Sequence, residues 1–152
     1  MWQNNGNLQF TDVTHTSGTA GRGTSTFAAV FFDANNDGYP DLMTACEFGR
    51  NDFWLGQGDG SFVPAKLPEI YGGFSMGLTV GDIDNDGDED LICVRKEPFT
   101  STGRDINILF MNEDGVLVDR TSVYAIASNV DGEQGFLTPT NDRDVKMADL
   151  FD

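Results

Sequence analysis

Two short acidic stretches carry the side chains that could do chemistry. In each stretch, side chains with oxygen atoms stand at positions 1, 3, 5 and 9, and a glycine stands at position 6. The side chains are Asp33, Asn35, Asp37 and Asp41 in the first stretch, and Asp82, Asp84, Asp86 and Asp90 in the second. The glycine allows a sharp turn that brings positions 1, 3 and 5 to one point. Oxygen-only sets of this kind suit a hard divalent cation, and calcium, which takes about six to eight oxygens, is the first choice.

The two stretches occupy corresponding places in an internal repeat. The second begins about 50 residues after the first, and an apolar run follows each of them, at 42–46 and 91–94. Short apolar or alternating runs, separated by Gly, Asn and Asp, fill the rest of both units, whereas helical periodicity is nearly absent. A repeat of about 50 residues that holds four short strands is typical of a β-propeller blade. We therefore expect an all-β fold made of β-propeller blades, each with four antiparallel strands.

The positions of these runs predict about two whole blades and two flanking pieces. In chain order, the expected parts are the last strand of a neighbouring blade at 8–14, a blade at 24–66 with its loop at 33–41, a second blade at 73–121 with its loop at 82–90, and the start of a further blade at 144–152. Propellers close with about four to eight blades. The chain should therefore be an incomplete propeller, either as a fragment of a longer polypeptide or as one of several copies that together close a ring.

The charge balance argues against two kinds of partner. The chain of 152 residues has 25 acidic and 9 basic residues, a net charge of −16. Nucleic acids and anionic membranes attract positive charge, so we expect no nucleic-acid partner. No run approaches the roughly 20 apolar residues of a membrane helix, so we expect no membrane insertion. A surface that only promotes solubility is the simpler interpretation, but many of the aspartates are the proposed ligands.

The cysteines and the calcium loops bear on the compartment. Cys46 and Cys93 each follow an acidic loop, and they could form a disulfide between equivalent strands or remain buried thiols, which we favour. Calcium loops of this kind usually need the high calcium concentration found outside cells. We therefore expect an extracellular or cell-surface protein, although residues 1–6 do not form a signal peptide.

Several motifs resemble one known family. They are Phe-Thr-Asp-Val-Thr at 10–14, Asp-Gly-Ser-Phe at 59–62, Gly-Phe-Ser-Met-Gly at 73–77, and the Asp-x-(Asn/Asp)-x-Asp-Gly-x-x-Asp-Leu loops at 33–42 and 82–91. Together they are similar to the FG-GAP or VCBS repeats of integrin alpha-subunit propellers and of many bacterial secreted proteins. The resemblance covers nearly the whole chain. It implies a calcium loop between the first two strands of each blade, extracellular display, and a role in adhesion or ligand recognition.

The expected calcium sites add a backbone oxygen to each set of side chains. The carbonyl groups of Tyr39 and Asp88, at position 7, complete the two predicted sites. An EF-hand fits poorly, because position 12 holds no glutamate and strands replace the helices, and magnesium fits less well because it retains water ligands. A third loop would begin at Asp149, but Phe151 stands where its second oxygen ligand is expected. Acidic turns without metal are the alternative.

No group of residues predicts catalysis. His15, the single histidine, lies in a loop-like stretch without an evident nucleophile, and carboxylates that hold calcium are poor proton carriers. We therefore expect a non-enzymatic, calcium-stabilised segment that acts in adhesion, ligand recognition or extracellular assembly. Its expected partners are a protein or glycan ligand and other blades of the same or a neighbouring chain.

Two alternatives remain for the function. The segment could be a non-catalytic scaffold of a larger secreted enzyme, or a lectin with glycan sites between its blades. A lectin would need aromatic side chains on which sugars stack, and packing between blades is the other expected role of these residues. The candidates are Trp2, Phe53, Trp54, Tyr71 and Phe74.

Overall fold

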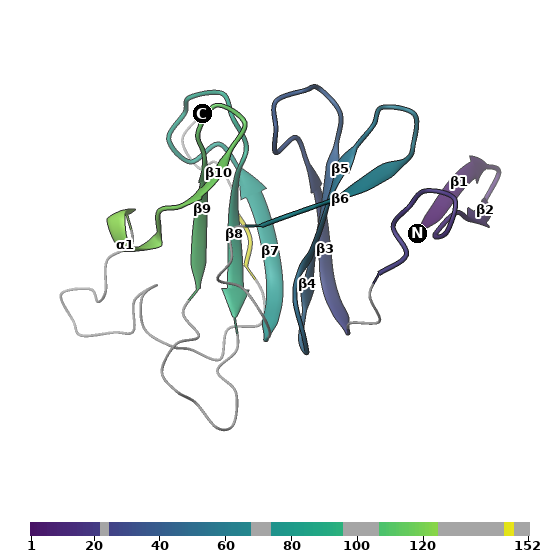
Figure 1. Ribbon diagram of the computed structural model, residues 1–152, viewed down its shortest axis with the longest axis horizontal. Coiled ribbons are helices and arrows are strands. Elements are labelled where there is room, and N and C mark those ends of the chain that lie inside the picture. Colours follow the sequence, from purple (N-terminus) through teal and green to yellow (C-terminus); the bar gives the residue numbers. More distant parts are fainter. Residues whose placement is uncertain (22–24, 68–73, 96–106, 125–144, 148–152) are drawn as a thin grey trace.

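The computed structural model describes residues 1–21, 25–67, 74–95, 107–124 and 145–147. Its strands form three antiparallel sheets, two of which have four strands each (Figure 1). The one helix among these residues, α1 (Thr121–Tyr124), is a single turn. No helix in the described part of the chain has the length and apolar character required to span a membrane. The all-β prediction is confirmed.

The first four-stranded sheet, blade one, contains the first acidic loop. Its strands are β3 (Thr26–Phe32), β4 (Asp41–Cys46), β5 (Asp52–Gly56) and β6 (Phe62–Ala65). They pair in chain order, each antiparallel to the next. β4 is buried along its whole length, so both of its faces are covered, and four of its six residues are apolar.

The second four-stranded sheet, blade two, repeats this arrangement. Its strands are β7 (Ser75–Gly81), β8 (Asp90–Arg95), β9 (Ile108–Asn112) and β10 (Leu117–Asp119), again paired in chain order. A shift of register between Thr26 and Ala28 in blade one recurs between Ser75 and Gly77 in blade two. The internal repeat seen in the sequence is therefore a repeat of backbone structure.

The main core lies between the two blades. The sheets stand side by side, and β3 and β4 of blade one contact β7 of blade two (Figure 1). The buried residues of the core cluster come from both sheets and from loop one: Phe32, Ala34, Met43, Phe53, Leu91, Cys93, Ile108, Phe110 and Leu117. Burial of this apolar surface, at roughly 25 cal/mol per Å², is the main favourable term holding the blades together.

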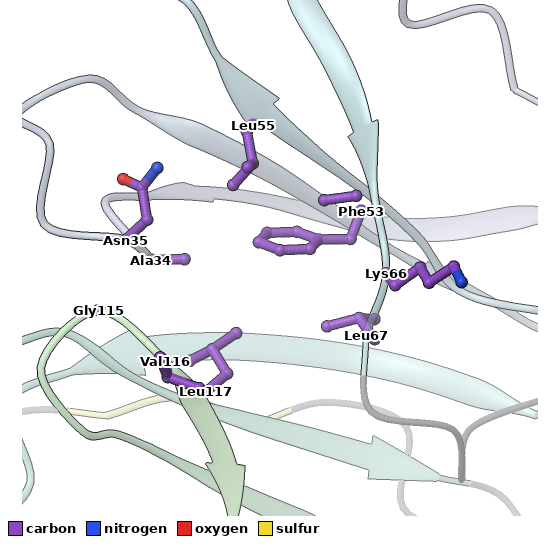
Figure 2. A pocket seen from close by; sticks show the side chains of 10 residues that line it. Ala34, Asn35, Phe53, Leu55, Lys66, Leu67, Gly115, Val116 and Leu117 are labelled. Atoms are coloured by element: carbon purple, nitrogen blue, oxygen red, sulfur yellow. The ribbon is translucent and has the colours of Figure 1, made fainter.

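A cavity of about 410 Å³ lies between the outer strands of the two blades. Figure 2 shows Phe53 and Leu55 of blade one on one side, with Val116 and Leu117 of blade two opposite. The sheets therefore contact each other along their inner strands, and part of the space between their outer strands is open.

The third sheet is a hairpin on the far side of blade one. It joins β1 (Trp2–Gly6) to β2 (Gln9–Asp12), and every residue of both strands is exposed (Figure 1). The strand predicted at 8–14 therefore exists, at 9–12, and its partner is the strand that precedes it. That this hairpin belongs to a neighbouring blade stays a prediction.

The C-terminal piece, predicted to begin a further blade at 144–152, is described only at 145–147. There the backbone N–H of Met147 donates a hydrogen bond to Thr79 Oγ1 at 3.2 Å. The Met147 side chain lies against Gly81. Both partners belong to β7, so this piece lies beside the first strand of blade two, while the predicted third loop at Asp149 falls outside the described residues.

Both cysteines are buried, and no disulfide joins them. Burial raises the pKa of the Cys93 thiol, and hydrogen bonds with the side chains of Ser75 and Asn51 oppose this increase in part. The thiols act as small core side chains, which was the favoured interpretation of the sequence.

A matched pair of leucines tests the core between the blades. Leu91 is fully buried, whereas Leu8 is 92% exposed. Leu91→Ala should lower the free energy of unfolding by about 2–5 kcal/mol, because it removes buried contacts and leaves a cavity. Leu8→Ala should change it by less than about 0.5 kcal/mol. Urea unfolding followed by tryptophan fluorescence measures both, and equal losses would contradict this assignment of the core.

Candidate metal sites

Each acidic loop connects the first and second strands of its blade. Loop one runs from β3 to β4 and loop two from β7 to β8. In both loops the backbone is left-handed at positions 4 and 6, with φ of 58° at Asn36, 83° at Gly38, 59° at Asn85 and 102° at Gly87. Asparagine and glycine tolerate this conformation best. The loops therefore share one backbone path, set by two residues in each.

The carboxylate at position 1 closes each loop. Asp82 accepts hydrogen bonds from the backbone N–H groups of Asp86 (3.1 Å) and Gly87 (3.0 Å). In loop one, Asp33 accepts the equivalent bonds at 3.1 and 2.8 Å. The first aspartate is thus fixed by the turn that the position 6 glycine allows.

Loop two brings three carboxylates together. Asp82, Asp84 and Asp86 each offer one oxygen, and these oxygens lie within 4.8 Å of one another. All three residues are exposed. Like charges at this spacing repel one another, and a divalent cation would remove the repulsion. The donors are hard oxygens only, so the residues present fit calcium.

Loop one differs because its position 3 is an amide. Asn35 Oδ1 accepts a hydrogen bond from the Asp37 backbone N–H at 3.1 Å, and its Nδ2 donates to Asp37 Oδ2 at 2.9 Å. The described residues of loop one contain no group of three converging carboxylates. Its predicted side-chain ligands are therefore Asn35 and three aspartates, against four aspartates in loop two.

The aspartate at position 9 is the most buried residue of each loop. Asp90 is fully buried, and its two oxygens accept hydrogen bonds from the backbone N–H groups of Ile83 (2.7 Å) and Asn112 (2.8 Å). Ile83 is at position 2 of the loop, and Asn112 ends β9. The carboxylate therefore joins the loop to the third strand of its own blade.

Blade one repeats this arrangement. Asp41 is fully buried and accepts hydrogen bonds from the N–H groups of Ala34 (3.0 Å) and Gly56 (2.8 Å). Gly56 lies so close to Pro40 that a Cβ would be 2.2 Å from its carbonyl oxygen. The sequence pattern identified the aspartates but not their N–H partners, since a backbone donor has no signature in the sequence.

Burial shapes the electrostatics of position 9. Loss of solvent raises the pKa of Asp41 and of Asp90 above the ordinary value for aspartate. The two backbone donors lower each pKa in part, while neighbouring loop aspartates raise it. Because each carboxylate oxygen has two lone pairs, these bonds leave acceptor capacity. Asp41 and Asp90 thus stay predicted ligands, although neither is in the three-carboxylate group.

Position 7 completes the predicted sites with a backbone carbonyl. The backbone N–H of Tyr39 donates to Asp37 Oδ1 at 2.8 Å, and that of Asp88 donates to Asp86 Oδ1 at 2.9 Å. The Tyr39 ring packs on Gly58, where a Cβ would lie 2.5 Å from the ring. The two residues hold equivalent places, and their roles as carbonyl ligands stay predictions.

These features define a repeat protein of β-propeller-like blades, each with an acidic hairpin loop. The FG-GAP-like repeat family matches residues 1–44 and 33–93, which together include the hairpin, blade one and the start of blade two. The chain belongs to this family. No curated protein matches the sequence.

The buried aspartate at position 9 and the exposed aspartates of loop two should contribute differently to the stability of the metal-free protein. With a chelator present, Asp90→Asn should lower the free energy of unfolding by about 1–3 kcal/mol, because a buried backbone donor loses its acceptor. Asp84→Asn removes an exposed charge from a crowded group, so it should leave stability unchanged or slightly higher. Chemical unfolding in EDTA compares them. A larger loss for Asp84→Asn would contradict the structural role given to position 9.

Proposed function

We propose that the chain is a calcium-binding β-propeller repeat segment of an extracellular or cell-surface protein, with structural calcium in both loops. The observation that carries the proposal is the convergence of Asp82, Asp84 and Asp86 in a hairpin loop that is repeated in both blades. A bound calcium ion would neutralise these carboxylates and hold the ends of the hairpin together. The family match supports the repeat architecture in which such loops would serve.

A structural role is supported by what the loop carboxylates already do. Positions 1 and 9 accept backbone hydrogen bonds within the blade, so these carboxylates already hold the loop and the third strand in place. His15 is exposed. We therefore propose a protein without catalytic activity of its own.

Adhesion, ligand recognition or extracellular assembly is the proposed role of the segment. Its negative net charge favours the binding of cations and disfavours the binding of nucleic acids. The lectin alternative is less well supported, because Trp54 is buried and Phe53, which lines the cavity between the blades, is only 9% exposed. Trp2 is exposed, Phe74 is half-buried, and Tyr71 lies outside the described residues.

Removal of calcium tests the proposal most directly. EDTA should lower the melting temperature of the purified chain by many degrees at low salt, because the carboxylates of each loop would then repel one another. Added calcium should restore the melting temperature, and magnesium should restore it less. Differential scanning calorimetry measures the change. An unchanged melting temperature in EDTA and in excess calcium would overturn the proposal.

A pair of substitutions in loop two tests the ligand assignment. Asp86→Ala should weaken calcium binding at loop two strongly, because it removes a carboxylate of the converging group. Asp88→Asn should weaken binding much less, because Asp88 is expected to contribute only its backbone carbonyl. Isothermal titration calorimetry of both variants gives the affinities. Equal effects would mean that the net charge of the loop governs binding.

A further inference from the structure

Loop one receives a hydrogen bond acceptor from the neighbouring blade. The backbone N–H of Asp33, at position 1 of loop one, donates to Glu89 Oε2 at 3.0 Å. Glu89 is at position 8 of loop two, 56 residues along the chain. Its carboxylate therefore reaches out of its own blade and fixes the first residue of the other loop.

Two more contacts hold the same junction. Asn112 Nδ2 at the end of β9 donates to Asn36 Oδ1 of loop one at 3.4 Å. Gly115, in the turn between β9 and β10, lies so close to loop one that a Cβ would be 2.7 Å from the Asn35 carbonyl oxygen. Figure 2 shows the Gly115 turn of blade two next to the loop that carries Asn35, whose side chain points away from it. Blade two thus contacts loop one at the backbone of positions 1 and 3 and at the side chain of position 4.

The number of carboxylates in each loop explains why the Glu89 carboxylate is important for loop one. Loop one has Asn35 where loop two has Asp84, so its predicted ligand set has one carboxylate fewer. Glu89 places a further carboxylate at the start of loop one. At the corresponding position 8, loop one has Pro40, which has no carboxylate to offer a neighbour. Of the two loops, only loop two therefore has a side chain at position 8 that can reach a neighbouring loop in this way.

We propose that Glu89 is a positioning residue for the cation site of loop one, and that it acts from the neighbouring blade. The inference rests on the proposed function and adds a coupling to it. Glu89 fixes the Asp33 backbone, and its charge attracts the cation without contacting it. By linkage, cation binding at loop one then strengthens the junction between the blades by the same factor by which the junction strengthens binding.

The test measures calcium affinity at loop one alone. In a full chain carrying Asp84→Asn and Asp86→Asn, loop two is disabled, and titration calorimetry reports loop one. Glu89→Gln keeps the shape and an oxygen acceptor but removes the charge, so it should weaken binding roughly 3- to 10-fold at low salt and less at high salt. Glu89→Ala removes the acceptor as well and should weaken binding further.

Asp114→Asn is the matched control, because it removes one charge from the exposed turn after β9 in the same blade. It should change the affinity of loop one by less than about twofold. A second readout needs no metal: amide hydrogen exchange at Asp33, followed by NMR in EDTA, should be faster in Glu89→Ala than in the unchanged chain, because its N–H loses its acceptor.

The outcomes separate this inference from the proposed function. Calcium binding at loop one that is unaffected by Glu89→Gln and Glu89→Ala would overturn the inference and leave the proposed function standing. Equal weakening by Glu89→Gln and Asp114→Asn would also overturn it, since only the overall charge would then matter. Absence of calcium binding to the unchanged chain would overturn both.

Discussion

Each blade depends on the hydrogen bonds that the buried carboxylate at position 9 accepts from the backbone. Asp41 and Asp90 are fully buried, and each accepts two backbone hydrogen bonds, one from its own loop and one from the third strand. A buried carboxylate without such partners would cost several kcal/mol. The same two bonds recur in both blades. The hairpin and the third strand of each blade are therefore joined without the help of a cation.

The repeat made much of this fold predictable. The two loops and their apolar flanks appear in the sequence as one pattern written twice, so the strands, their order and the convergence of Asp82, Asp84 and Asp86 could be expected. The hydrogen-bond partners of the aspartate at position 9 could not be predicted, because every residue except proline has a backbone N–H group. The contact between Glu89 and Asp33 was also hidden, since it depends on how two sheets pack and not on either repeat alone.

The junction between the blades combines two kinds of interaction at different depths. Apolar side chains such as Met43 and Phe110 fill the space between the sheets, and this attraction has little directional preference. At the loop end, the hydrogen bonds from Asp33 and Asn112 require one particular alignment of the sheets. The core therefore supplies most of the attraction between the blades, while the polar contacts favour one alignment of the two sheets.

The cavity between the outer strands has a geometric consequence. Sheets that touch along their inner strands and separate toward their outer strands form wedges, and a stack of wedges follows an arc. The side chains on either side of the cavity, such as Phe53 and Leu117, then act as spacers that set the angle of each wedge. The angle between these two blades therefore depends on the volumes of a few apolar side chains.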